Sequence, residues 1–201
     1  MIILRTKSRP THGICWPPTR TRVIIILCPG KKWTPASMTD VAQFTAVNRS
    51  LVKTALQVLA GDLEQIEGPW GDVLYDLPGA PRPHEETPAP PRLMAMWDSV
   101  LLAYADRGRI IPDDYRAVVI RRNGDVLPTL LVDGYVAGVW RPVDGGIEVT
   151  AFHELPAAAW RGLRTEAKAL LAFLAGREPR VYSRYARWWS SLPAAEVRVL
   201  A

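Results

Sequence analysis

The sequence predicts an α+β protein, in which a short helical region with a β-hairpin precedes a small antiparallel β-domain with a C-terminal helix. Three observations support this prediction. Apolar residues recur at helical spacing on both sides of a three-residue break at 45–47, and six prolines lie within residues 77–91. Beyond them, glycine-containing turns separate four strand-like runs, and a long amphipathic stretch follows. A chain of 201 residues can hold one large domain or two small ones.

Composition narrows the class of protein. Hydrophobic residues make up 48% and charged residues 22%, which is typical of a soluble globular chain and argues against general disorder. The longest aliphatic run, residues 23–27, is far shorter than the roughly 20 residues that span a bilayer. We therefore expect no membrane segment, no secretory signal and a cytoplasmic protein. Two cysteines, Cys15 and Cys28, are too few for a disulfide framework or a zinc site.

The net charge of +5 is unevenly distributed. No acidic residue precedes Asp40, whereas seven of the 25 lysines and arginines lie before it. A basic arm is typical of a nucleic-acid contact, because neutralising phosphates releases condensed counterions. The alternative is a solvated tail, and four prolines before residue 30 exclude a long helix there. We predict that residues 1–32 form a basic, proline-rich and poorly ordered arm.

Two short helices are expected between residues 37 and 59. Ser37 is a capping-type residue, and Asp40 lies three positions later, where a carboxylate suits the helix dipole. Asn48 can cap a second helix that runs from about Arg49 to Leu59 with apolar residues at helical spacing. Two short helices joined by a three-residue break predict a helix-turn-helix.

A β-hairpin follows this helix pair. Short alternating segments at 63–67 and 72–75 flank the turn sequence Gly68-Pro69-Trp70-Gly71. Helix, break, helix and hairpin is the order of a winged helix, although helix pairs beside strands also occur in unrelated domains. We predict a winged-helix domain over residues 33–76.

The proline-rich stretch 77–91 predicts an extended linker, and residues 92–201 a second domain. Four strand-like runs follow at 118–122, 126–132, 135–141 and 147–152, and the turns between them contain Asn123-Gly124, Asp133-Gly134 and residues 144–146. They predict a four-stranded antiparallel sheet or partial barrel. Pro156 suits the first turn of a helix that continues to about Ala175 and covers the sheet.

Several segments resemble a bacterial winged-helix family. The resemblance rests on DLPGAP at 76–81, TPAPPR at 87–92, WDSVLLAYADR at 97–107, RIIP at 109–112, NGDVLPT at 123–129 and LVDG at 131–134, with Gly138 and Trp140-Arg141. This family contains the DNA glycosylases that unhook interstrand crosslinks and protect azinomycin producers. The resemblance covers residues 33–152 and, more loosely, the C-terminal helix.

The resemblance implies tandem winged helices around a DNA-binding channel, followed by a small β-domain. This chain is similar only to the last winged helix and the C-terminal domain. The family's catalytic pattern, Gln-apolar-Gln or Gln-x-Asp, belongs to the upstream part. Gln43, Gln57 and Gln65 do not form this pattern, and the nearest imitation, Gln65-Ile66-Glu67, lies in the predicted hairpin. Both of its polar side chains should lie on one solvated strand face.

Candidate DNA contacts follow from the predicted elements. Asn48, Arg49 and Lys53 lie in the first turns of the second helix, where a recognition helix meets base edges or phosphates, although a merely exposed polar face is an equal alternative. Four further candidates for phosphate contacts are Arg107, Arg109, Arg121 and Arg122, although the last two flank the Asn123-Gly124 turn, where a merely solvated turn is the commoner alternative. Double-stranded DNA is therefore the expected partner, and no protein partner can be specified.

Cleavage of a glycosidic bond requires a positioned water or carboxylate. Asp98 is a weak candidate in the apolar stretch 94–102, where a buried carboxylate would need partners. Asp106 is a second weak candidate, but beside Arg107 and Arg109 it can equally form an ion-pair cluster. The three histidines are too widely spaced for a metal site, so neither metal nor cofactor is expected.

Near the C-terminus, basic and aromatic residues interleave: Arg180, Tyr182, Arg184, Tyr185, Arg187, Trp188 and Trp189. Such residues can stack on single-stranded bases, but packing of the aromatics on the β-domain is commoner. The leading hypothesis is a DNA-binding relative of the crosslink-repair glycosylases without their catalytic motif. Its alternatives are an active DNA glycosylase and a non-catalytic protein-interaction module.

Overall fold

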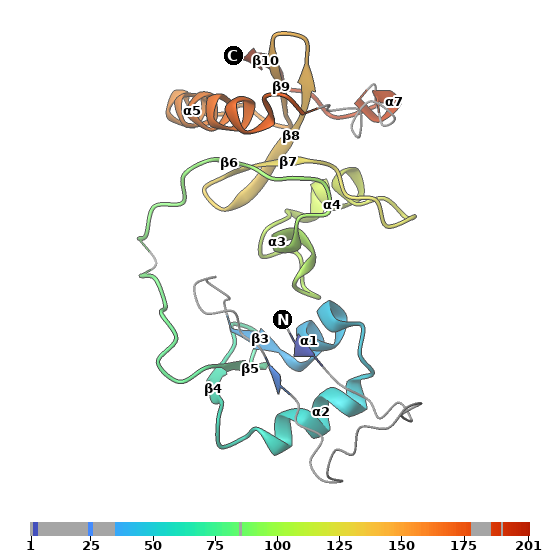
Figure 1. The fold of residues 1–201 in the computed structure, drawn as a ribbon, viewed down its shortest axis with the longest axis vertical. Coiled ribbons are helices and arrows are strands. Elements are labelled where there is room, and N and C mark those ends of the chain that lie inside the picture. The colour runs from blue at the N-terminus through green and yellow to red at the C-terminus, as the bar shows by residue number, and fades with distance from the viewer. Residues whose placement is uncertain (1, 4–23, 26–34, 85, 178–185, 190) are drawn as a thin grey trace. The chain divides into compact units, whose positions relative to one another are not determined.

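The computed structural model describes residues 2–3, 24–25, 35–84, 86–177, 186–189 and 191–201 (Figure 1). The chain divides into two compact units, residues 1–83 and 84–201, at a point within the proline-rich stretch. Most of the predicted basic arm, with both cysteines, lies outside the described residues. Its described parts are β1 (Ile2–Ile3) and β2 (Ile24–Ile25), which pair antiparallel.

The first unit continues with two helices followed by a β-hairpin. Its elements are β3 (Ala36–Ser37), α1 (Met38–Thr45), α2 (Arg49–Val58), β4 (Glu64–Glu67) and β5 (Val73–Asp76). The last three strands of this unit form an antiparallel sheet in the order β3-β5-β4. The predicted helix pair and hairpin are confirmed. The strand preceding α1 was not predicted, because two residues are too short to show an alternating pattern.

Side-chain caps determine where both helices begin. The Ser37 hydroxyl accepts a hydrogen bond from the Asp40 backbone N–H at 3.2 Å, and the Asp40 carboxylate accepts one from the Ser37 N–H at 2.8 Å. This reciprocal capping box satisfies two N–H groups that no helical carbonyl can reach. The break between the helices is fixed by Ala46, which has a φ of 55°. Asn48 Oδ1 then accepts from the Ser50 N–H at 2.9 Å and caps α2.

A small apolar core holds the helices on the hairpin. Ala42, Val52 and Leu56 are buried in it. Partly buried residues from the helices, their connections and β5 pack around these three: Met38, Val41, Val47, Leu63 and Tyr75. Because the apolar side of α2 is used here, its polar side faces solvent.

In the second unit, the described strands form one five-stranded antiparallel sheet in the order β10-β9-β8-β7-β6. The strands are β6 (Arg92–Leu93), β7 (Thr129–Val132), β8 (Tyr135–Val143), β9 (Gly146–Ala151) and β10 (Glu196–Leu200). The central meander β7-β8-β9 agrees with the prediction. Positive φ angles at Asp133, Gly134 and Gly145 form its turns. The two edge strands were not predicted from the sequence.

One predicted strand was wrong. Residues 118 and 119 end the helix α4 (Asp113–Val119), and only Ile120 forms an isolated bridge, with Val126. Pro112 with its φ of −51° and the two acidic residues of the first turn favour a helix here. The β-branched pair Val118-Val119 at its end favours a strand locally, which is why the sequence predicted one there.

Helices cover both faces of this sheet. The helix α5 (Ala157–Leu174) buries Trp160, Leu163 and Ala167 against one face, as predicted. On the other face, the second core cluster combines Leu127, Leu131, Val136 and Val139 with α4 and with Leu101 of α3 (Ser99–Leu102). Trp188 and Trp189 of α7 (Ala186–Trp189) pack against that second cluster, which favours the packing role predicted for them. Arg180 and Arg184 lie outside the described residues, as does the side chain of Arg187.

The fold is therefore a mixed α/β structure with antiparallel sheets, in which a long C-terminal helix is followed by a strand (Figure 1). In the part of the chain that the structure describes, no helix combines the length and the apolar character needed to cross a lipid bilayer.

Candidate nucleic-acid interface

The start of α2 carries the predicted DNA-contacting residues of the first unit. Asn48, Arg49 and Lys53 are all exposed. The Oδ1 atom of Asn48 is occupied, because it accepts hydrogen bonds from the N–H and the hydroxyl of Ser50, each at 2.9 Å. Its amide group remains available to donate to a ligand.

Arg49 and Lys53 place two positive charges on one side of α2. Residues four positions apart are neighbours on a helix surface. Neither side chain forms an ion pair with a described residue, so no described carboxylate neutralises their charge. A surface of this kind attracts phosphate groups.

A hollow of about 510 Å³ lies where α1 meets α2. It is lined by Thr39, Ala42, Gln43, Val47, Asn48 and Arg49. Two of the predicted contact residues, Asn48 and Arg49, thus line the same hollow as the apolar side chains of Ala42 and Val47. The hollow is open to solvent and offers a place where a base edge or sugar could be received next to the charges on α2.

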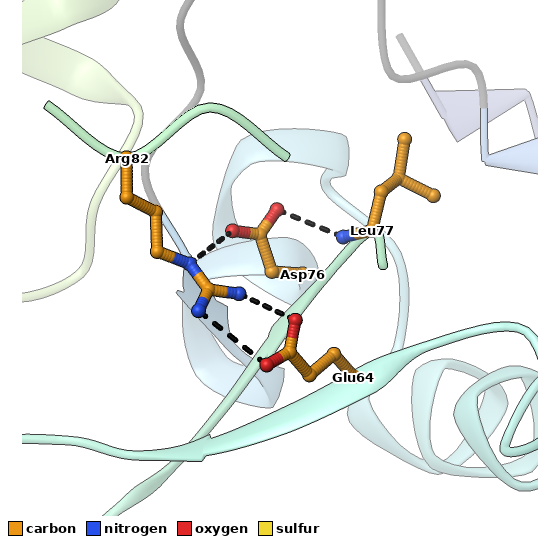
Figure 2. Close-up of polar contacts among 4 residues, drawn as sticks. All are labelled: Glu64, Asp76, Leu77 and Arg82. Carbon is orange, nitrogen blue, oxygen red and sulfur yellow. Dashed lines mark hydrogen bonds and ion pairs between the residues drawn. The ribbon is translucent and has the colours of Figure 1, made fainter. Parts of the chain in front are cut away.

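The basic residue Arg82 is excluded from such a role by its own contacts. Its guanidinium donates to both carboxylate oxygens of Glu64, at 2.6 and 3.4 Å, and its Nε lies 3.5 Å from a carboxylate oxygen of Asp76 (Figure 2). The other oxygen of Asp76 accepts the Leu77 N–H at 2.8 Å. Hydrogen bonding to Glu64, followed by the charges of Glu64 and Asp76, raises the pKa of Arg82.

In the second unit, Arg107 and Arg109 form an electropositive group. The Nε atoms of both are buried, and neither has a hydrogen-bond partner within the described part of the chain. The Arg109 guanidinium lies over the Tyr104 ring, 5.1 Å from its centroid. Burial lowers the pKa of Arg107, and the positive charge of Arg116 lowers it further.

Arg116 was not identified from the sequence. It lies nine positions after Arg107 and enters the group only because α4 brings it back toward the loop before the helix. No periodicity in the sequence links the two residues. Neither Arg107 nor Arg116 forms an ion pair with a described residue, and like charges brought close together favour the binding of an anion.

The predicted ion-pair cluster around Asp106 is not formed. The ion pairs among the described residues do not join Asp106 to Arg107 or Arg109. Instead, Asp106 Oδ1 accepts the backbone N–H of Gly108 at 3.0 Å. The side chain of aspartate is short, so it reaches the backbone N–H two residues later more readily than it reaches the guanidinium of a neighbouring arginine.

The other catalytic candidate, Asp98, has the same kind of contact. Its Oδ1 accepts the backbone N–H of Val100 at 2.9 Å and caps α3. The expected buried carboxylate is only half-buried. Asp98 and Asp106 thus both accept a hydrogen bond from the backbone N–H two residues later, which gives each carboxylate a structural role.

Arg121 and Arg122 differ in their surroundings. The Arg121 guanidinium lies over the Trp188 ring, 4.6 Å from its centroid, and its Nε is buried. Arg122 is exposed and forms no ion pair with any described residue. Of the two, Arg122 is the one whose charge is open to a ligand.

The Gln65-Ile66-Glu67 segment forms most of β4. Gln65 lies opposite Tyr75 and Glu67 opposite Val73, and both polar side chains are exposed. This is the solvated strand face that the sequence predicted. Among the described residues, no group of three or more potential metal ligands comes together.

Comparison with known proteins identifies the family to which the chain belongs. The model of a family described as DNA glycosylase AlkZ-like matches residues 31–173, which is most of the chain. The chain belongs to the AlkZ-like DNA glycosylase family. The family relationship predicted from the segments between residues 76 and 141 is therefore confirmed.

A solved relative shows how far this likeness extends. The structure of Streptomyces sahachiroi DNA glycosylase AlkZ is similar with a TM-score of 0.56 and 19% sequence identity. The match covers 69% of this chain but only 38% of that chain, so the AlkZ-like chain described here spans less than half of that glycosylase. At this identity the likeness concerns the fold alone. A comparison with curated proteins finds no match.

Proposed function

We propose that this AlkZ-like chain binds double-stranded DNA through a winged-helix domain at residues 33–76, joined by a linker at 77–91 to a β-domain at 92–201. The chain order supports the winged-helix interpretation, because the α1-α2 pair lies between the short strand β3 and the β4-β5 hairpin, and β3 pairs with β5 of that hairpin. In this interpretation α2 is the recognition helix.

The observation that carries the proposal is the unneutralised charge at the start of α2. Arg49 and Lys53 are exposed without ion-pair partners in the described part of the chain, and Asn48 offers its amide beside them. These are the groups by which a recognition helix contacts phosphates and base edges. A hollow of about 510 Å³ that is open to solvent lies beside them.

A second set of phosphate contacts is proposed on the β-domain itself. It consists of Arg107, Arg109 and Arg122, with Arg116 added from α4, whereas Arg121 is a weaker candidate because its guanidinium lies over the Trp188 ring. Arg107 would gain from a bound anion, because its charge is partly desolvated and lies near the like charge of Arg116.

We further propose that this chain binds DNA without excising a base. The Gln-apolar-Gln or Gln-x-Asp pattern is absent from the given sequence, and Asp98 and Asp106 are accounted for by turns and caps. A protein that binds chromosomal DNA acts in the bacterial cytoplasm, where we place this one.

The test is fluorescence anisotropy of a labelled duplex, with and without an interstrand crosslink, across a salt series. We expect log K to fall linearly with log salt concentration, and the Arg49→Gln/Lys53→Gln double variant to lower the slope by about 2. A Gln43→Ala variant, which removes no charge, serves as the matched control for the slope.

Parallel samples are treated with alkali to reveal abasic sites. Salt-dependent binding without abasic product supports the proposal. Abasic product that disappears in the Asp98→Asn variant would overturn it in favour of a glycosylase. Absence of binding at low salt would reject DNA as the partner and favour the protein-interaction module.

A further inference from the structure

A second hollow lies where the first turns of α5 meet β10. It has a volume of about 330 Å³ and is lined by Leu155, Ala157, Trp160, Arg161, Arg164 and Arg198. Three of these six residues are arginines, and two elements of the fold contribute them. Arg161 and Arg164 share one side of α5, because positions three apart are neighbours on a helix surface. Pairing of β10 with β9 adds Arg198 from the other end of the sequence.

The positive charge of this hollow exceeds the negative charge beside it. Arg161 and Arg164 are exposed, and neither guanidinium contacts a described carboxylate. Because both charges lie on the same side of α5, they repel each other. Arg198 is paired with Glu196, so the three arginines and this carboxylate leave two positive charges in the hollow. Such an arrangement attracts an anion.

Arg198 is held in place and still has donors to offer. Its guanidinium lies over the Trp160 ring, 4.3 Å from the centroid. Its Nε donates to Glu196 Oε1 at 2.5 Å, while Glu196 Oε2 accepts the indole N–H of Trp160 at 3.0 Å. Nη2 contacts the same carboxylate, but no described group accepts a hydrogen bond from Nη1. A guanidinium fixed in this way loses little freedom when it binds an anion.

The start of α5 adds backbone donors to those of the arginines. Pro156 is its N-cap and provides no side-chain hydrogen bond. The N–H groups of Ala157 and Ala158 have no acceptor among the described residues, and Ala157 lines the hollow. The first turn contains no acidic residue, although a carboxylate is favoured at this positive end of the helix dipole. An anion in the hollow would supply the missing negative charge.

The donors indicate which anion fits. Guanidinium groups form paired hydrogen bonds with both phosphate and carboxylate oxygens. Here the donors come from the side of a helix, from its first turn and from a strand, which suits the tetrahedral oxygens of phosphate better than a planar carboxylate. Since Arg161 and Arg164 are exposed, a free phosphate ion gains little from them in water. A phosphate within a nucleic acid is held by the other contacts of the same strand, which raises its effective concentration at the hollow.

We propose that the hollow between α5 and β10 binds one backbone phosphate of a DNA duplex. This inference rests on the proposed function, because it requires that the chain binds DNA. It extends the nucleic-acid interface of the β-domain to Arg161, Arg164 and Arg198, which do not belong to the group formed by Arg107 and its neighbours.

The first measurement locates the phosphate. The backbone amide signals of Ala157 and Ala158 are followed by heteronuclear NMR while the full chain is titrated with a short duplex or with inorganic phosphate. The duplex should shift both signals, and inorganic phosphate at the same concentration of phosphate groups should shift them far less. Equal shifts would overturn the assignment to DNA, because the hollow would then be a site for a small phosphate ligand.

The second measurement uses the salt series on the labelled duplex. Arg161→Gln/Arg164→Gln should lower the slope of log K against log salt concentration by about 1, which is the contribution of one phosphate. Its affinity at low salt should fall roughly 2- to 30-fold. Arg161→Lys/Arg164→Lys keeps both charges and should keep the slope. Lys168→Gln/Arg177→Gln is the matched control, because it removes two charges from exposed residues that do not line the hollow.

The outcomes distinguish this inference from the proposed function. If Arg161→Gln/Arg164→Gln keeps the wild-type slope, or if the duplex leaves both amide signals unmoved, the inference is overturned. The lower slope of Arg49→Gln/Lys53→Gln would then still support the proposed function. A wild-type protein that does not bind the duplex at low salt would overturn both.

Discussion

Arg82 and Glu64 are joined by two hydrogen bonds between residues 18 positions apart, with Nη2 2.6 Å from Oε2 and Nη1 3.4 Å from Oε1 (Figure 2). Glu64 is the first residue of β4, and Arg82 lies within the proline-rich stretch that follows β5. The same guanidinium reaches Asp76, the last residue of β5. The open end of the hairpin is thus tied to the first residues of this stretch.

Replacing Arg82 by glutamine should therefore release residues 77–82 from the hairpin. Exposed ion pairs add little to global stability, so we expect a melting temperature close to that of the wild type. Hydrogen exchange at residues 77–82 should be faster, and Arg82→Lys should be intermediate because lysine cannot donate in the same paired geometry. Arg122→Gln, which removes an arginine without an ion-pair partner in the described residues, is the control. If hydrogen exchange at residues 77–82 is unchanged in Arg82→Gln, the contacts of Arg82 do not hold this segment on the hairpin.

Gly138 of β8 should be essential for the sheet of the second unit. A Cβ atom there would lie 2.2 Å from the Thr150 carbonyl oxygen in β9 and 3.0 Å from a Leu130 methyl group in β7. Because a strand backbone cannot move away cheaply, Gly138→Ala should destabilise the protein by about 3 kcal/mol in urea unfolding. Gly61→Ala is the matched control, since nothing lies within 4 Å of the added atom. Equal stability of the two variants would show that β8 and β9 do not approach so closely.

Local sequence signals predicted much of this fold. Ser37 and Asn48 identified both helix starts of the first unit, and the Asp133-Gly134 turn identified a hairpin. Each of these signals acts within a few residues, where a side chain satisfies the backbone beside it or a positive φ is needed. Pro156 likewise indicated the start of α5.

Features that depend on distant partners were not predictable. The strand β10 pairs with β9 across more than forty residues, and β6 is too short to show an alternation. The strand predicted at 118–122 was wrong because Val118 and Val119 favour a strand locally, whereas Pro112 and the acidic first turn of α4 favour a helix. In the candidate site, the proximity of Arg107 and Arg116 follows from α4 and could not be read from spacing.

The cap formed by Asp98 gives a way to separate structure from catalysis. Asparagine caps a helix as well as aspartate does, whereas alanine costs about 1 kcal/mol. Asp98→Asn should therefore match the wild type in thermal unfolding, and Asp98→Ala should be less stable. Neither variant should alter DNA binding measured by anisotropy. A loss of abasic product in Asp98→Asn at unchanged stability would instead assign the carboxylate to catalysis.

The group formed by Arg107, Arg109 and Arg116 should bind anions. Burial and the charge of Arg116 lower the pKa of Arg107, yet a guanidinium stays protonated at neutral pH, so the group is positively charged and lacks a carboxylate partner among the described residues. An anion that binds the folded state alone raises the apparent stability. Phosphate should therefore raise the melting temperature more than chloride does at equal ionic strength.

The difference between phosphate and chloride should disappear in Arg107→Gln and shrink in Arg116→Gln, which removes a charge but leaves Arg107 in place. Lys168→Gln is the control, because this exposed residue lies on α5 and outside the hollow that Arg161, Arg164 and Arg198 line. The salt dependence of stability should change as well. Since Arg116 repels Arg107, Arg116→Gln should make the protein less dependent on salt for its stability. If phosphate raises the melting temperature equally in all three variants, phosphate acts by its general exclusion from the protein surface. Arg107 and Arg116 would then not be phosphate contacts.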